Sequence, residues 1–133
     1  MLQKGQRSIL YIDDDDDDRM MVKDAINLID DKLILIESAN AQEGLGYLQK
    51  AFVEKKLPCL VLLDLNMPGM NGRDMLMVIK DDEDLSKVPV VVFTTSTSEL
   101  DKTFCKKYNV EMITKPFSFQ SLKAVMHSIL CKC

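Results

Sequence analysis

The sequence has no tryptophan, one histidine, no apolar stretch long enough to span a membrane and no signal-peptide pattern at Met1–Ile12. It also lacks internal repeats and Gly/Ser-rich linkers. At 133 residues the chain is expected to form one domain, residues 1–133. These absences favour a cytoplasmic protein with no membrane partner. The histidine, His127, has no neighbouring acid, so we expect it to face solvent rather than to carry a phosphoryl group.

The four cysteines lack the spacing of a disulfide framework or a zinc ribbon, which suits a reducing compartment. Cys59 precedes an apolar run, so we interpret it as a small buried hydrophobe. Cys131 and Cys133 stand at the very end of the sequence, where fraying disfavours a stable metal site. Cys105 is likewise expected to have no metal-binding or disulfide role. The sequence therefore predicts four free thiols.

The negative charge of the chain is concentrated in one place. Twenty-one acidic and 17 basic side chains give a net charge of −4, and six of the acids form the run Asp13–Asp18. Without that run the balance becomes 17 − 15 = +2. An acidic protein is a poor candidate for direct nucleic-acid binding. The remaining composition, 47% apolar and 29% charged, is typical of a globular domain.

Five short, nearly continuous apolar runs indicate strands that are covered on both faces, as in a parallel sheet. The runs are Ile9–Ile12, Leu33–Ile36, Leu60–Leu63, Val90–Phe93 and Val110–Ile113. Glu111 interrupts the last run, which favours an edge strand there.

Between these runs the apolar residues recur at intervals of three and four, as on one face of a helix. The stripes are Val22, Ile26 and Ile29; Leu45, Leu48 and Phe52; Leu76 and Ile79; Leu100, Phe104 and Tyr108; and Leu122, Val125, Met126 and Ile129. Strict alternation of strand and helix predicts an α/β fold with right-handed crossovers. The length fits a doubly wound, flavodoxin-like (βα)5 domain with strand order 2-1-3-4-5, whereas a closed eightfold barrel needs roughly twice the chain.

Acidic residues follow the first and third predicted strands, at Asp13, Asp14 and Asp64. In a doubly wound sheet, ligands bind beyond the carboxyl ends of the strands, where the strand order reverses. Three carboxylates gathered there would repel one another, and a hard divalent cation such as Mg²⁺ (or Mn²⁺) removes that repulsion. The rest of the acidic run, Asp15–Asp18, is expected to cap the following helix and complement its dipole.

Thr94 and Lys115 end the fourth and fifth predicted strands, so their hydroxyl and ammonium groups are expected at the same edge. Either residue alone has a plain explanation, as a β-branched strand residue or a solvated charge. Together with the carboxylates and a divalent metal, they predict a site for phosphoryl transfer.

Four segments of the chain resemble the signatures of response-regulator receiver domains, the CheY-like family. They are Ile9–Asp14, Leu62–Gly72, Val92–Ser96 and Lys115–Phe117, and they occur in the family's order over essentially the whole chain. The resemblance implies a stand-alone receiver of two-component signalling without an output domain. Such a protein is a phosphoacceptor rather than an enzyme acting on a separate substrate.

The resemblance also implies roles for the acidic residues. Asp64 would accept a phosphoryl group from a sensor histidine kinase or a phosphotransfer protein. Asp14, Asp64 and the backbone carbonyl of Asn66 would bind the metal directly, and Asp13 would act mainly through a metal-bound water.

Further roles follow from the same resemblance. Thr94 and Lys115 would contact the phosphoryl group, and Thr95 would offer it a backbone amide. Asn66 and Ser96 would tune the rate at which water removes the phosphoryl group. The bond before Pro116 is expected to be cis, as is usual in the family.

One position departs from the family. Three residues before Lys115, where the family often has an aromatic switch residue, this chain has Met112. A thioether fills similar volume but has no ring to reorient. The downstream protein target is expected on the fourth helix, fifth strand and fifth helix, by analogy with the family alone.

The same residues disfavour several other functions. An aspartyl phosphohydrolase normally has a second acid two residues after its nucleophile, and Asn66 stands there instead. A flavin phosphate would be repelled by Asp13–Asp18. An EF-hand is disfavoured because the run lacks the required glycine and terminal glutamate. A degenerate receiver that only binds proteins is disfavoured by the complete set of acids, threonine and lysine.

Overall fold

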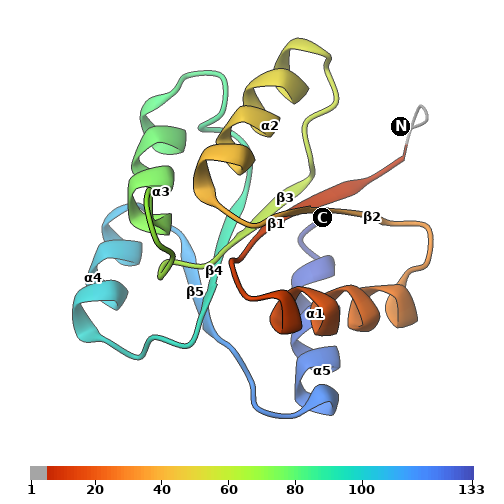
Figure 1. Ribbon diagram of the computed structural model, residues 1–133. Helices are drawn as coiled ribbons and strands as arrows, with labels where there is room; N and C mark the ends of the chain where they lie inside the picture. Colours follow the sequence, from red (N-terminus) through yellow and green to blue (C-terminus); the bar gives the residue numbers. More distant parts are fainter. Residues whose placement is uncertain (1–5) are drawn as a thin grey trace.

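The computed structural model describes residues 6–133, which form five strands alternating with five helices (Figure 1). The elements are β1 Ser8–Ile12, α1 Asp16–Ile29, β2 Ile34–Ser38, α2 Ala41–Val53, β3 Leu60–Leu63, α3 Gly72–Asp81, β4 Val90–Thr94, α4 Glu99–Lys107, β5 Glu111–Thr114 and α5 Phe119–Leu130. No helix in this part of the chain has the length and apolarity needed to cross a bilayer.

The strands form one parallel sheet in the order β2-β1-β3-β4-β5, which confirms the predicted doubly wound, CheY-like fold. In the register, Ile12 lies opposite both Ser38 and Leu63, and Thr94 lies opposite Thr114. The carboxyl ends of the strands therefore lie close to level with one another. This alignment brings the residues that follow β1 and β3 to the same edge of the sheet.

The sheet is covered on both faces, with α1 and α5 on one side and α2 and α3 on the other (Figure 1). On the α1/α5 side, the Tyr11 and Phe93 rings are fully buried and meet edge to face, with centroids 6.4 Å apart. On the α2/α3 side, Leu10 and Ile12 pack against Leu48 of α2. Alternate residues of β1 thus serve the two cores, as the continuous apolar run predicted.

The helix α4 departs from its predicted stripe. Leu100 is 82% exposed, whereas Asp101 and Cys105 are buried. The other two predicted stripe residues, Phe104 and Tyr108, are half-buried and pack against the core on the α2/α3 side, and Asp101 forms an ion pair with Arg73 of α3. In α5, His127 is exposed, as expected.

The expectation of four free thiols is wrong for one pair. Cys59, just before β3, and Cys133, just after α5, form a disulfide, with their Cα atoms 5.2 Å apart. The two residues are 74 positions apart, and α5 returns the end of the chain to the start of β3 (Figure 1). Sequence spacing could not reveal a contact that depends on this packing. Cys105 is free and buried, and Cys131 is free and exposed.

Candidate functional site

Asp13, Asp14 and Asp64 lie together at the carboxyl edge of the sheet. A carboxylate oxygen from each lies within 4.8 Å of the other two. Asp13 is fully buried and Asp64 is 6% exposed, whereas Asp14 is open to solvent. Three oxygen donors with one solvent-facing side fit a hard divalent cation that keeps part of its water shell.

Lys115 places its ammonium group among these carboxylates. Its Nζ lies 2.6 Å from Asp13 Oδ2, 2.8 Å from Asp18 Oδ2 and 3.1 Å from Asp64 Oδ2. The side chain of Lys115 is only 9% exposed. Burial lowers the pKa of Lys115, but the hydrogen bonds that it donates to Asp13 and Asp18, together with the charge of Asp64, outweigh this effect, so the pKa lies above its usual value. Lys115 therefore stays cationic.

Asp18 was expected mainly to cap α1 and complement its dipole, but it also pairs with Lys115. The helix cap itself is Asp15, whose side chain accepts from the backbone N–H groups of Asp17 and Asp18. Asp18 precedes the buried Val22 by four positions, so the two share the inward face of α1. That spacing was the available signal for the second role of Asp18.

Tyr11 is a second residue of the site that the sequence motifs did not predict. Its hydroxyl donates to Asp13 Oδ2 at 2.6 Å, and the other carboxylate oxygen of Asp13 accepts from the backbone N–H of Asp15 at 3.0 Å. Burial, followed by the charge of Asp13, raises the pKa of Tyr11 well above its usual value. The phenol is therefore a neutral donor that orients Asp13.

Opposing effects act on the pKa of the Asp64 carboxyl group. Burial raises its pKa, the charge of Lys115 lowers it and the charge of Asp13 raises it again, and the pKa ends above its usual value. Hydrogen bonding from Lys115 and from Thr94 also lowers it. Thr94 is fully buried at the end of β4, so its hydroxyl lies at the same edge as Asp64.

The segment after Asp64 turns directly into α3. The backbone N–H of Asn66 donates to Asp64 Oδ1 at 3.3 Å, while the Asn66 side chain is exposed. Gly72, the first residue of α3, approaches the strand end so closely that a Cβ there would lie 2.1 Å from the Asp64 backbone oxygen. The glycine is needed because any side chain would push the helix away from Asp64.

The remaining predicted residues lie around this centre. Thr95 is exposed and Ser96 is half-buried, and the Ser96 N–H donates to Thr94 Oγ1 at 3.3 Å. Met112 is half-buried and packs beside Leu65 and Val92 rather than among the carboxylates. The expectation of a cis bond before Pro116 is wrong. All peptide bonds in residues 6–133 are trans, which is the form that X–Pro bonds favour by about 0.5–1 kcal/mol.

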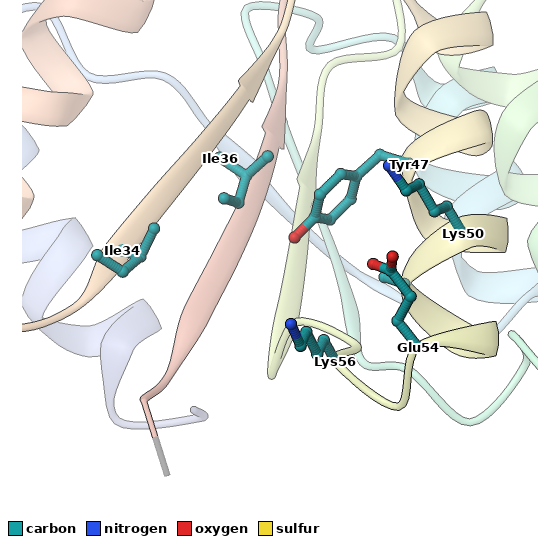
Figure 2. Close-up of a pocket in the computed structure, with 7 residues that line it drawn as sticks. Ile34, Ile36, Tyr47, Lys50, Glu54 and Lys56 are labelled. Carbon is teal, nitrogen blue, oxygen red and sulfur yellow. The ribbon is translucent and has the colours of Figure 1, made fainter. Parts of the chain in front are cut away.

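A separate cavity of about 390 Å³ lies between β2 and α2 (Figure 2). Ile34, Ile36 and Tyr47 form its apolar walls, and Lys50 and Lys56 lie at its rim. Ile34 opens β2 at the amino end of the strand, whereas the acidic cluster follows the carboxyl ends. The cavity is therefore not part of the acidic site.

Comparison with known proteins gives concordant results. A family model described as the response regulator receiver domain matches residues 9–127. The response regulator Rcp1 of Synechocystis sp. is 37% identical over 95 residues, covering 70% of this chain and 65% of Rcp1. FilR2 of Methanothrix harundinacea, described as a probable methanogenesis regulatory protein, is 43% identical over 77 residues, covering 56% of this chain and 49% of FilR2. The match thus spans about half to two-thirds of these two relatives.

Solved structures agree with the sequence relatives. The phosphorylated cyanobacterial phytochrome response regulator RcpA is 28% identical, with a TM-score of 0.86 over 94% of this chain and 91% of that one. The Mn²⁺-bound form of Rcp1 is 29% identical, with a TM-score of 0.77 over 92% of this chain and 91% of that one. The fold, the acidic edge and the family match lead to one conclusion: this chain belongs to the response regulator receiver domain family.

Proposed function

We propose that this chain is the phosphoacceptor switch of a two-component phosphorelay, with Asp64 as the acceptor. The observation that carries the proposal is the position of Asp64 beside the Asp13 and Asp14 carboxylates, with the Lys115 ammonium 3.1 Å away. The donor is a histidine kinase or a phosphotransfer protein. An Asp64 oxygen forms the new bond to phosphorus while the bond from phosphorus to the donor's histidine nitrogen breaks, leaving its electron pair on that nitrogen.

The metal is proposed to be Mg²⁺ or Mn²⁺, bound by Asp14, Asp64 and the Asn66 backbone carbonyl, with Asp13 acting through a water molecule. The three carboxylates have the oxygen donors and the spacing that such an ion requires. The solved Mn²⁺-bound form of Rcp1 supports the choice of ion. When bound, the ion supplies positive charge for the phosphoryl oxygens.

The protein's own contribution is to orient and to neutralise charge. Lys115 is already held over the Asp64 carboxylate and can pair with a phosphoryl oxygen by leaving one of its three carboxylate partners. Thr94 supplies a hydroxyl and Thr95 a backbone N–H. Asn66 and Ser96 border the site and are proposed to tune hydrolysis. Preorganised donors of this kind supply most of the rate in phosphoryl transfer.

The output is proposed to be a change in protein binding, by a single domain covering residues 1–133 in the cytoplasm. The proposed surface comprises α4, β5 and α5. It includes the exposed Lys102, Lys106 and Lys107 of α4, and Met112 lies beneath it. Phosphorylation would act as a population shift between two states of this face. Direct binding of nucleic acid or membrane is not part of the proposal.

The test is intact-mass analysis after incubation with acetyl phosphate and Mg²⁺. We expect one added phosphoryl group on the wild-type protein and none without metal or in Asp64→Asn. Asp74→Asn, which alters an exposed acid on α3, is the matched control and should be labelled like the wild type. Absence of an adduct on the wild type with Mg²⁺ present would overturn the proposal.

A further inference from the structure

One arginine connects the two loops that border Asp64. Arg73, in the first turn of α3, donates from Nε to Asp101 Oδ1 at 2.9 Å, and its Nη2 contacts the same oxygen. The same Nη2 also reaches Asn66 Oδ1 at 3.4 Å. A single guanidinium group thus contacts both α4 and the residue two positions after Asp64.

Asp101 extends this connection to the loop after β4. It is 5% exposed, and its Oδ2 accepts from the Ser96 hydroxyl at 2.5 Å. The Ser96 oxygen also accepts from the backbone N–H of Ser98 at 3.2 Å. Burial raises the pKa of Asp101, but the bonds from Ser96 and Arg73 and the charge of Arg73 outweigh it, and the pKa lies below its usual range. Asp101 is therefore an anionic acceptor at neutral pH.

The two side chains at the ends of this network belong to residues whose backbone contacts Asp64 or Thr94. The Asn66 backbone N–H donates to the Asp64 carboxylate, and the Ser96 backbone N–H donates to the Thr94 hydroxyl. The Asn66 side chain contacts Arg73, and the Ser96 hydroxyl contacts Asp101. Their acceptor oxygens are consequently engaged within the protein.

We propose that Arg73 and Asp101 are positioning residues that lengthen the life of the aspartyl phosphate by keeping Asn66 and Ser96 from orienting water. This inference rests on the proposed function of Asp64. In hydrolysis, a water oxygen bonds to phosphorus while the bond from phosphorus to the Asp64 oxygen breaks, leaving its electron pair on Asp64. The products are the Asp64 carboxylate and dihydrogen phosphate, which retains both protons of the water.

An acceptor beside the phosphorus atom aids this attack by orienting the water through one of its protons. Asn66 Oδ1 and Ser96 Oγ are the nearby side-chain acceptors that the network occupies. Removal of Arg73 releases Asn66 directly and loosens Ser96 through Asp101. An arginine suits this role because its planar fork can hold two acceptors at once, which a lysine ammonium does with less geometric control.

The test compares the first-order decay of the phosphorylated protein after the phosphodonor has been removed. We expect Arg73→Met and Asp101→Asn to decay about three- to tenfold faster than the wild type, while the rate of labelling and its Mg²⁺ dependence stay within about twofold. Arg73→Lys keeps the charge but not the fork and should decay at an intermediate rate. A purely structural defect would lower labelling instead of shortening the phosphoryl lifetime alone.

Three further variants make the test decisive. Glu99→Gln breaks an exposed ion pair with Lys102 in the same helix and should decay like the wild type. Arg73→Met alone would leave Asp101 as an unpaired buried charge, which could impair folding. The double variant Arg73→Met/Asp101→Asn removes that charge, and its phosphoryl group should still be lost faster than that of the wild type. Adding Asn66→Ala and Ser96→Ala to Arg73→Met should restore slow decay, because the freed acceptors are then gone.

The outcomes separate this inference from the proposed function. If the wild type takes up no phosphoryl group, the proposed function is wrong. If the wild type is labelled but Arg73→Met and the double variant decay at its rate or more slowly, the inference is wrong. It is also wrong if fast decay persists in full after both acceptors have been removed.

Discussion

The Lys115 ammonium lies closer to Asp13, at 2.6 Å, than to Asp64, at 3.1 Å. The lysine that would contact a phosphoryl group is thus shared, in the unphosphorylated protein, with a buried acid that is fully inaccessible to solvent. We therefore expect Lys115 and a bound divalent cation to neutralise the same carboxylates, so that their effects on stability overlap.

The variant Lys115→Met should show whether Lys115 and a divalent cation stabilise the same carboxylates. Removing one partner from a buried cluster of charges leaves the others uncompensated, and we expect the free energy of unfolding without metal to fall by about 3 kcal/mol. Saturating Mg²⁺ should recover much of that loss, so it should raise the urea midpoint of the variant more than that of the wild type. Lys123→Met, at an exposed position on α5, is the control. Equal stabilisation of both proteins by Mg²⁺ would contradict this view of the site.

Asp18→Asn tests the second role found for the acidic run. Asp18 accepts from Lys115 at 2.8 Å, and a hydrogen bond between charged groups contributes about 1.5–3 kcal/mol. Because 28% of the Asp18 side chain is exposed, solvent screening places the expected loss near 1 kcal/mol. Asp17→Asn changes an exposed neighbour in the same helical turn and should stay within about 0.5 kcal/mol. Chemical unfolding of the two variants should separate them, and equal losses would mean that Asp18 acts only through the helix dipole.

Gly72→Ala should displace the start of α3 from Asp64. The added Cβ would lie 2.1 Å from the Asp64 backbone oxygen, and backbone cannot yield as a side chain can. We expect a loss of about 1–3 kcal/mol in unfolding free energy and slower phosphoryl uptake. Gly46→Ala, in the middle of α2 with no atom within 4 Å of the new Cβ, should instead stabilise the protein by about 0.5–1 kcal/mol. Labelling of Gly72→Ala at the wild-type rate would show that the close approach is not needed at the site.

The lowered pKa of Asp101 predicts how the free energy of unfolding changes at acid pH. Its pKa is lowered in the folded state, so its contribution is fully present above the unfolded value of about 3.9 and is lost as the pH falls through the lower folded pKa. The nearby thiol of Cys105 does not titrate in this window, because burial, and then the charge of Asp101, raise its pKa.

The corresponding measurement is the difference in unfolding free energy between the wild type and Asp101→Asn across a pH series. The difference should be steady, at about 1–3 kcal/mol, from neutral pH down to about pH 5, and should shrink below about pH 4. Asp74→Asn, on the exposed side of α3, should show no such trend. A difference that grows toward acid pH would contradict the assigned direction of the pKa shift.

The sequence predicted the fold and the position of the acidic edge for a common reason. Continuous apolar runs imply parallel strands, and the carboxyl ends of parallel strands meet, so residues directly after Ile12 and Leu63 had to be neighbours. That argument needs only local periodicity and one topological rule. It holds even though several strand ends differ by one or two residues from those predicted, as at Glu111–Thr114.

The sequence could not predict contacts between side chains on different helices. Arg73 and Asp101 are 28 positions apart and belong to no shared motif, so nothing marked them as partners. The predicted apolar stripe of α4 placed Leu100 inward, whereas the structure exposes Leu100 and buries Asp101, which pairs with Arg73. The pairing of Cys59 with Cys133 likewise depends on where α5 ends, which periodicity does not specify.

The disulfide also determines how the molecule can be observed. With Cys59 and Cys133 joined and Cys105 buried, Cys131 is the single exposed thiol in the described part of the chain. A maleimide dye would therefore attach at one place, at the end of α5, without any engineered cysteine. Because the sequence contains no tryptophan, the protein has no intrinsic tryptophan emission, and the attached dye would supply the fluorescence signal that the chain lacks. The oxidised protein thus provides its own position for an optical probe at the end of one helix of the proposed binding face.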